Sequence, residues 1–138
     1  MKTVILFLLI SLSFLSPSHE ASATVRCLVE PKSVKGALKK STAVFAGEVL
    51  EIWTGVNFRQ ARFRVEQSWK GVEADEVFVV ADETAESPHY KVGEKYLVFA
   101  GTRNDKLFTG ICSRTKRLEY GAGDLQQLGK GRLHKKEE

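Results

Sequence analysis

Two cysteines, Cys27 and Cys112, are the residues of this chain best suited to covalent chemistry. They form no Cys-x-x-Cys motif. An even, minimal cysteine count in an exported chain is typical of one structural disulfide. We therefore expect a Cys27–Cys112 bridge, which would close a loop of about 86 residues and contribute up to roughly 4.5 kcal/mol of stability in the chain-entropy model.

The other reactive side chains lack the spacing that catalysis or metal binding requires. The acidic loop at 82–88 has no alternating acidic positions around a turn glycine, as a calcium loop would. His89 follows this loop as a solvated turn residue, and Cys112 has no positioned base beside it. The glycines form no phosphate-binding loop. We therefore expect no enzymatic activity, no metal site and no cofactor.

Arginines form a possible binding surface. Arg59, Arg62 and Arg64 are expected on the polar side of one strand, with Phe58 nearby. A basic strip beside an aromatic side chain is what a polyanion-binding surface needs, and the net charge is +4. For an exported protein the ligand would be an anionic, heparin-like glycan and not a nucleic acid. The alternative is a solvated charged face. Trp53, near a strand end, is a further candidate contact residue.

The first 23 residues have the pattern of a secretion signal. Lys2 precedes an apolar run from Val4 to Leu15, and Ala21-Ser22-Ala23 fits the small-x-small cleavage rule. This run is shorter than the roughly 20 apolar residues of a membrane span. We expect cleavage before Thr24, no transmembrane segment after processing, and a secreted or periplasmic protein.

Periodicity in the remaining chain predicts one mainly β domain. Ser33 caps a short predicted helix, and a second short helix is expected to end at Gly129. Strand-forming residues between turn signals predict five strands, at 43–52, 58–70, 77–81, 96–101 and 107–112. Trp69 is expected to share the core with Phe63 and Val65. The tail at 130–138 is polar and charged, and is expected to fray.

Five fragments, in order along the chain, resemble the netrin-like domain, the OB-fold module of the tissue inhibitors of metalloproteinases. They are Phe63-x-Val65, Trp69-Lys70-Gly71, Gly93-x-x-Tyr96-Leu97-Val98-Phe99-Ala100, Cys112-Ser113-Arg114-Thr115 and Asp124-Leu125-x-x-Leu128-Gly129. The resemblance covers about 27–129. It implies a domain at 24–129 built as a five-stranded Greek-key OB-fold barrel, with short helices near its N- and C-terminal ends and Cys27 bonded to Cys112.

One departure from the family pattern bears on mechanism. The inhibitors carry an N-terminal Cys-x-Cys pair, whose first member would fall at Val25, and its partner loop at 87–89 also lacks cysteine. In the family, the α-amine and carbonyl of that first cysteine chelate the protease zinc. Here the expected terminus is Thr24, one residue too early. The resemblance therefore implies the module without this way of binding zinc.

The resemblance also places a partner-contact ridge. Its residues are Thr24, Val25, Arg26, Cys27, Leu28, Glu86, Ser87, Pro88 and His89. We expect an exported, non-catalytic binding module that engages another exported or extracellular protein, or an extracellular polymer. The first alternative is a metalloendopeptidase inhibitor that presents this ridge to a zinc metalloprotease. The second is binding of a heparin-like glycan by the basic face.

Overall fold

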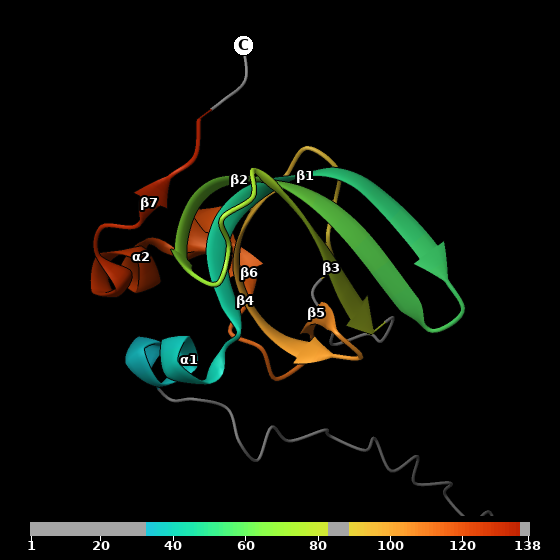
Figure 1. The fold of residues 1–138 in the computed structure, drawn as a ribbon, viewed down its shortest axis with the longest axis horizontal. Helices are drawn as coiled ribbons and strands as arrows, with labels where there is room; N and C mark the ends of the chain where they lie inside the picture. Colours follow the sequence, from blue (N-terminus) through green and yellow to red (C-terminus); the bar gives the residue numbers. More distant parts are fainter. Residues whose placement is uncertain (1–32, 83–88, 136–138) are drawn as a thin grey trace, which may run out of the picture.

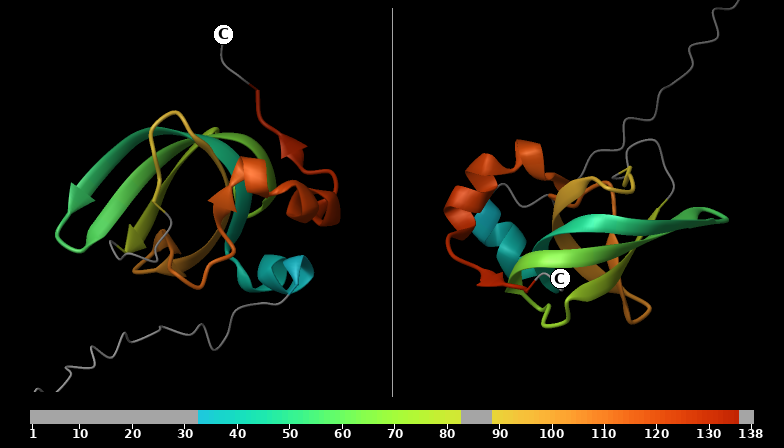
Figure 2. Two further views of the ribbon diagram at one scale, coloured as in Figure 1. Left: turned by 180° about the vertical axis from the view of Figure 1, so that it is seen from behind. Right: turned by 90° about the horizontal axis from the view of Figure 1, so that it is seen from above.

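The computed structural model describes residues 33–82 and 89–135, which form a mainly β domain with two α-helices (Figure 1). The elements are α1 (Val34–Lys40), β1 (Ala43–Gly55), β2 (Phe58–Lys70), β3 (Glu76–Asp82), β4 (Lys95–Arg103), β5 (Lys106–Thr109), β6 (Lys116–Arg117), the 3-10 turn η1 (Leu118–Tyr120), α2 (Ala122–Leu128) and β7 (Arg132–Leu133). The two helices lie on one side of the strands, and the β1–β2 hairpin projects on the opposite side (Figure 2).

The five longer strands pair in a closed ring. Their order is β1-β2-β3-β5-β4, and β4 pairs back onto β1. Every neighbouring pair in the ring is antiparallel except β3 and β5, which are parallel. The short strands β6 and β7 attach to β4 and β2. The predicted β class and five strand segments are therefore confirmed.

The fifth strand is shorter than predicted. β5 ends at Thr109, and Ser113 N–H donates to the Gly110 carbonyl oxygen at 3.0 Å. This bond closes a turn over 110–113, so that part of the chain is not extended. Cys112 consequently lies in the turn after β5 and not in a strand.

The β1–β2 ladder contains register shifts that bend both strands. The shifts leave Glu66 and Trp69 of β2 without a partner in the β1 register. An extra residue in one strand reverses the alternation of side chains between the two faces. Trp69 therefore does not join Phe63 and Val65, and the prediction that it shares their core is wrong. It packs on the helix side of the ring, where its indole N–H donates to the Gly129 carbonyl at 2.9 Å.

Two apolar clusters stabilise the fold, and β4 contributes to both. Tyr96, Val98 and Ala100 point inside the ring, where aromatic rings pack edge to face. Leu97 and Phe99 point to the other side and pack against the helices. Both faces of this strand are thus buried, which explains its unbroken apolar run.

The start of α1 and the end of α2 lie where the sequence predicts them. The Ser33 hydroxyl oxygen accepts from Gly36 N–H at 3.0 Å and caps α1. Gly129 follows α2 with φ of 70°, a left-handed conformation that favours glycine. Among the described residues, no helix is long and apolar enough to cross a membrane.

An ion cluster anchors α2. Asp124 is buried and accepts two hydrogen bonds from the Arg114 guanidinium, at 2.7 and 2.9 Å, while Lys116 Nζ lies 3.0 Å from its Oδ2. Burial alone would raise the pKa of Asp124, but the bonds from Arg114 and Lys116 outweigh burial and lower it. The carboxylate therefore stays ionised and fixes the helix to the segment after β5.

Part of the C-terminal tail is ordered against the sheet. Arg132 and Leu133 form β7 on the edge of β2, opposite Ser68 and Gln67. This edge is open because β3 pairs with β2 only as far as Arg64. The expected fraying is thus wrong for this part of the tail, because the tail satisfies strand groups that β3 leaves unpaired.

Candidate functional site

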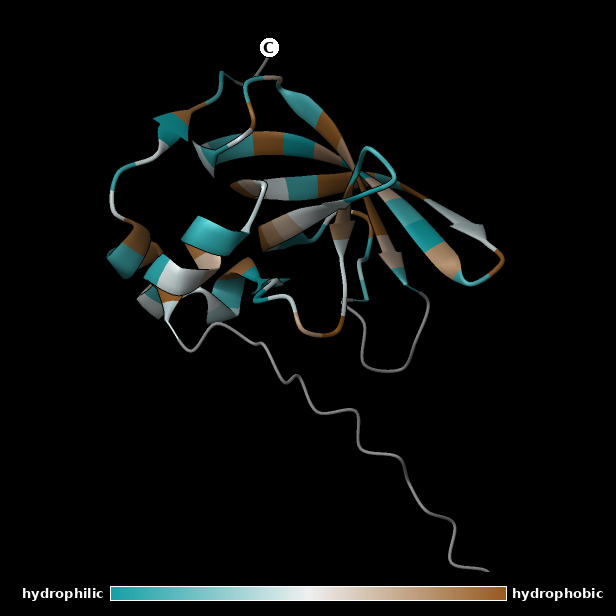
Figure 3. Cartoon of the chain, turned by 60° about the horizontal axis from the view of Figure 1, so that its bottom comes forward, coloured by the Kyte–Doolittle hydropathy of each residue, from teal (hydrophilic) through white to brown (hydrophobic). Residues whose placement is uncertain are grey.

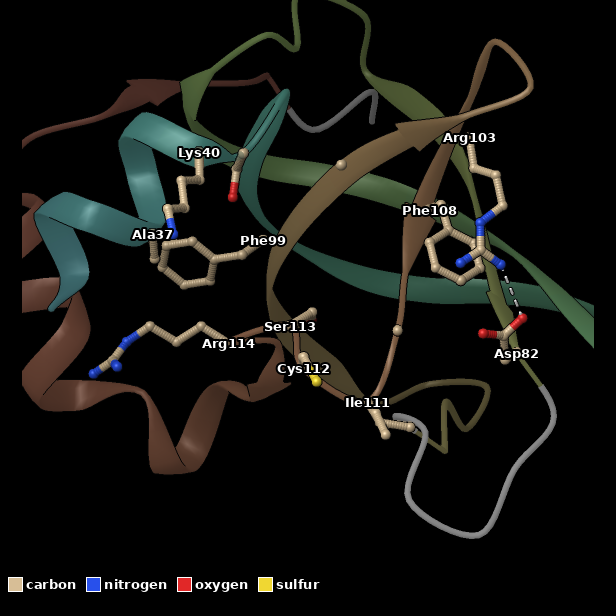
Figure 4. Close-up of a pocket in the computed structure, with 13 residues that line it drawn as sticks. Ala37, Lys40, Asp82, Phe99, Arg103, Phe108, Ile111, Cys112, Ser113 and Arg114 are labelled. Carbon is tan, nitrogen blue, oxygen red and sulfur yellow. Dashed lines mark hydrogen bonds and ion pairs between the residues drawn. The ribbon is translucent and has the colours of Figure 1, made fainter. Parts of the chain in front are cut away.

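Most of the predicted contact ridge lies outside the described residues. This holds for 24–28, which includes Cys27, and for 86–88. Cys112 is half-buried and lines a cavity of about 430 Å³ beside Phe99 and Ile111 (Figure 4). No cysteine among the described residues is free. The Cys27–Cys112 bridge and the ridge therefore stay predictions.

His89, the one ridge residue that is described, is exposed beside a tyrosine network. The Tyr96 hydroxyl lies 3.0 Å from the His89 carbonyl oxygen, 3.0 Å from Lys91 N–H and 2.8 Å from Glu94 Oε2. Burial and the bond to Glu94 raise the pKa of Tyr96 to about 12, so it stays a neutral donor. The network fixes the main chain just before β4 begins, through the carbonyl oxygen of His89 and the N–H of Lys91.

The predicted basic face is a face of mixed charge. Arg62 Nη atoms lie 2.9 Å from Glu76 and 3.2 Å from Glu51, and Arg64 Nη2 lies 2.9 Å from Glu48. Arg59 alternates to the other side of β2, in register with buried Ala81, so the prediction that it lines the same face is wrong. Each of the two outward arginines already has a carboxylate partner. An anionic polymer would have to displace these glutamates.

Exposed aromatic side chains gather on the outer face of β1, β2 and β3. Trp53, Phe58 and Phe78 are 41%, 42% and 50% exposed. The ring centroids of Trp53 and Phe78 are 5.9 Å apart, although Trp53 lies on β1 and Phe78 on β3. Their strand neighbours Ile52 and Val77 pack on the ring core, so strand alternation points the aromatics outward. Apolar and polar segments accordingly alternate along these strands (Figure 3).

Two hollows beside these aromatics form what we call the aromatic groove. One, of about 280 Å³, is lined by Phe58, Gln60, Val80, Asp82, Arg103, Asn104, Lys106 and Phe108. The other, of about 400 Å³, is lined by Gln60, Val77, Phe78, Val80, Asp105, Lys106 and Leu107. Both share Gln60, Val80 and Lys106, so they adjoin. The aromatic groove runs across the outer faces of β2, β3 and β5.

One wall of the groove is held rigid by Arg103. Its guanidinium carbon lies 3.6 Å from the centroid of the Phe108 ring, and its Nη1 lies 3.3 Å from Asp82 Oδ1 (Figure 4). The cation therefore covers the Phe108 ring and is itself paired. The turn at Asn104 and Asp105, with φ of 49° and 59°, brings the two strands of this wall together. Phe58 and Phe78 remain the open aromatic surfaces of the groove, and Trp53 adjoins the groove through its contact with Phe78.

A second constellation was missed by sequence reasoning. His134 Nδ1 lies 3.0 Å from Asp75 Oδ1, and its Nε2 lies 2.9 Å from Ser68 Oγ. This serine–histidine–aspartate arrangement resembles a catalytic triad, in which the histidine acts as base for a serine nucleophile and the aspartate orients the histidine. However, Ser68 is buried, its hydroxyl donates to the Val72 carbonyl at 3.0 Å, and the His134 side chain is 1% exposed. The burial of these two side chains leaves no access for a substrate. Their hydrogen bonds instead tie the segment after β7 to β2, and we call the Ser68–His134–Asp75 contacts the clasp.

No family model matches this chain, and no curated protein matches it either.

Within the described ranges, no three His, Cys, Asp or Glu side chains group as a metal site would require. The aromatic groove is therefore the candidate functional site that the geometry of the described residues favours.

Proposed function

We propose that this protein is an exported, non-catalytic binding module of the netrin-like type, and that the aromatic groove contacts its partner. The observation that carries the proposal is the exposed pair of Trp53 and Phe78, with exposed Phe58 farther along the same sheet face. Exposed apolar surface costs solvation free energy, and contiguous patches mark interaction sites. Aromatic residues also dominate the energetics of interfaces.

Strand order supports the OB-fold part of the proposal. A five-stranded ring in the order β1-β2-β3-β5-β4, closing on β1, is the order of a Greek-key OB-fold barrel. OB-folds bind ligands through one sheet face and the loops beside it. The aromatic groove lies on such a face, between the β1–β2 hairpin and the β4–β5 turn. Cys112 belongs to one of the fragments that resemble the netrin-like domain, although it lies in the turn after β5 and not in the strand.

The state of the polar groups supports a non-catalytic role. The imidazole of His134, which has a serine and an aspartate partner, is inaccessible. At the groove, Asp82 and Arg62 are engaged in ion pairs. A general acid or base must reach the reacting atoms. The groove side chains therefore suit recognition better than proton transfer.

Retention of the purified mature protein on immobilised cell-surface and secreted material tests the proposal. We expect a variant with Trp53→Ala and Phe78→Ala to lose most of its retention. Tyr120→Ala is the matched control, because Tyr120 is 70% exposed but lies on η1. Equal retention of wild type and the double variant would show that the groove is not the contact surface.

A further inference from the structure

We infer that the ligand of the aromatic groove is an uncharged oligosaccharide chain. This inference rests on the proposed function and specifies its partner. Three properties of the groove carry it: the spacing of its aromatic ends, the chemistry of its floor and rim, and its charge balance.

The aromatic ends of the groove are spaced for an extended ligand. Phe58 of β2 lies opposite Asp82 of β3, and Phe78 of β3 lies opposite Arg62 of β2. The positions of the two phenylalanines are therefore four residues apart along β2. At the rise of a β-strand this spacing is about 13 Å. A single small ring cannot contact both ends, whereas a chain of linked rings can. Trp53, which contacts Phe78, widens that end into a platform of two rings.

The floor and rim match the two kinds of surface on a sugar ring. Val80 and the aromatic faces offer apolar contact, which suits the C–H face of a pyranose. Gln60 lies where the two hollows adjoin, and its amide can both donate and accept. Asn104 and Lys106 add polar groups at the rim. Apolar walls with a few directional polar groups are typical of small-ligand sites.

The charges around the groove nearly cancel. The acidic side chains are Glu51, Glu76, Asp82 and Asp105, and the basic ones are Arg62, Arg103 and Lys106. A polyanion such as heparin needs an excess of unpaired cations. Here Arg62 has two carboxylate partners and Arg103 has one. Charge complementarity therefore favours a ligand without net charge.

Tryptophan fluorescence tests the inference directly. A Trp69→Phe background leaves Trp53 as the one indole, because the chain has two tryptophans. The probes are cellohexaose, chitohexaose, laminarihexaose and mannohexaose, with heparin as the charged comparison. We expect a saturable change in Trp53 emission with at least one neutral probe. In this background Phe78→Ala should weaken that binding about tenfold or more, and Tyr120→Ala should leave it unchanged.

Two results would overturn the inference. One is the absence of a saturable change with every neutral probe up to about 10 mM. The other is tighter binding of heparin than of any neutral probe. If retention on native material still depends on Trp53 and Phe78 in either case, a protein or charged partner uses the groove and the proposed function survives. If retention is also independent of these residues, the proposed function fails as well.

Discussion

Replacing Asp124 by asparagine tests how α2 is held to the strand ring. The change keeps the size of the side chain but removes the charge that accepts from Arg114 and lies against Lys116. Charge-assisted hydrogen bonds contribute roughly 1.5–3 kcal/mol each, and neutral ones about 1 kcal/mol. Asparagine also turns an amide donor toward the guanidinium. The side chains of Arg114 and Lys116 are 21% and 29% exposed, so water recovers part of the loss.

We therefore expect Asp124→Asn to lower the free energy of unfolding by about 2–3 kcal/mol at neutral pH. Because the folded-state pKa of Asp124 is lowered, its contribution is fully present above the pKa of an ordinary aspartate. It disappears as the pH falls through the folded pKa. The difference between wild type and variant should accordingly shrink as the pH drops below about 4.

Urea unfolding followed by circular dichroism, at neutral pH and near pH 3, measures both quantities. Glu119→Gln is the matched control, because Glu119 pairs with Arg117 at 3.4 Å and its side chain is 60% exposed. That control should change stability by less than about 0.5 kcal/mol. A comparably small effect of Asp124→Asn, or one that does not depend on pH, would contradict the account of the anchor.

Four further substitutions, one of them a control, test other parts of the fold. Tyr90→Phe removes the buried bond to Thr109, which is 2.7 Å long, and should cost about 1–2 kcal/mol in urea unfolding, whereas an unchanged midpoint would argue against that bond. Gly71→Ala should lower the free energy of unfolding by about 2 kcal/mol or more, because φ of Gly71 is 66° and a Cβ there would meet the Thr42 carbonyl oxygen. Gly123→Ala is the control: its Cβ would lie in open space on α2, so stability should stay unchanged or rise by up to about 1 kcal/mol. His134→Ala should accelerate hydrogen exchange in β7, and unchanged protection there would show that the clasp does not hold the tail.

Local signals in the sequence were sufficient to predict most elements. The Ser33 cap and the stop at Gly129 depend on neighbouring residues only, and both are confirmed. The strand segments follow from local residue patterns, which are alternation in β2 and an unbroken apolar run in β4. These features need no knowledge of which strands pair.

Most errors came from features that depend on pairing, but the misplacement of Arg59 did not, because alternation along β2 alone puts it on the other side from Arg62 and Arg64. The shifts at Glu66 and Trp69 exist only in the register of β2 against β1, so alternation along β2 could not reveal them. The carboxylates that neutralise Arg62 come from two different strands. The clasp joins Ser68 to His134, 66 positions later in the chain. Trp53 was recognised as a candidate contact residue, but its contact with Phe78 across β2 required the fold.

Photo-crosslinking in cells that naturally make this protein tests the central claim most directly. A benzophenone-bearing phenylalanine analogue in place of Phe78 puts a reactive group at the aromatic groove. The same analogue in place of Tyr120 reports on a surface elsewhere that is more accessible, because Tyr120 is 70% exposed and Phe78 50%. The account predicts a discrete covalent adduct from position 78 and none from position 120. Adducts from position 120 alone, or from neither position, would contradict the assignment of the groove as the binding surface.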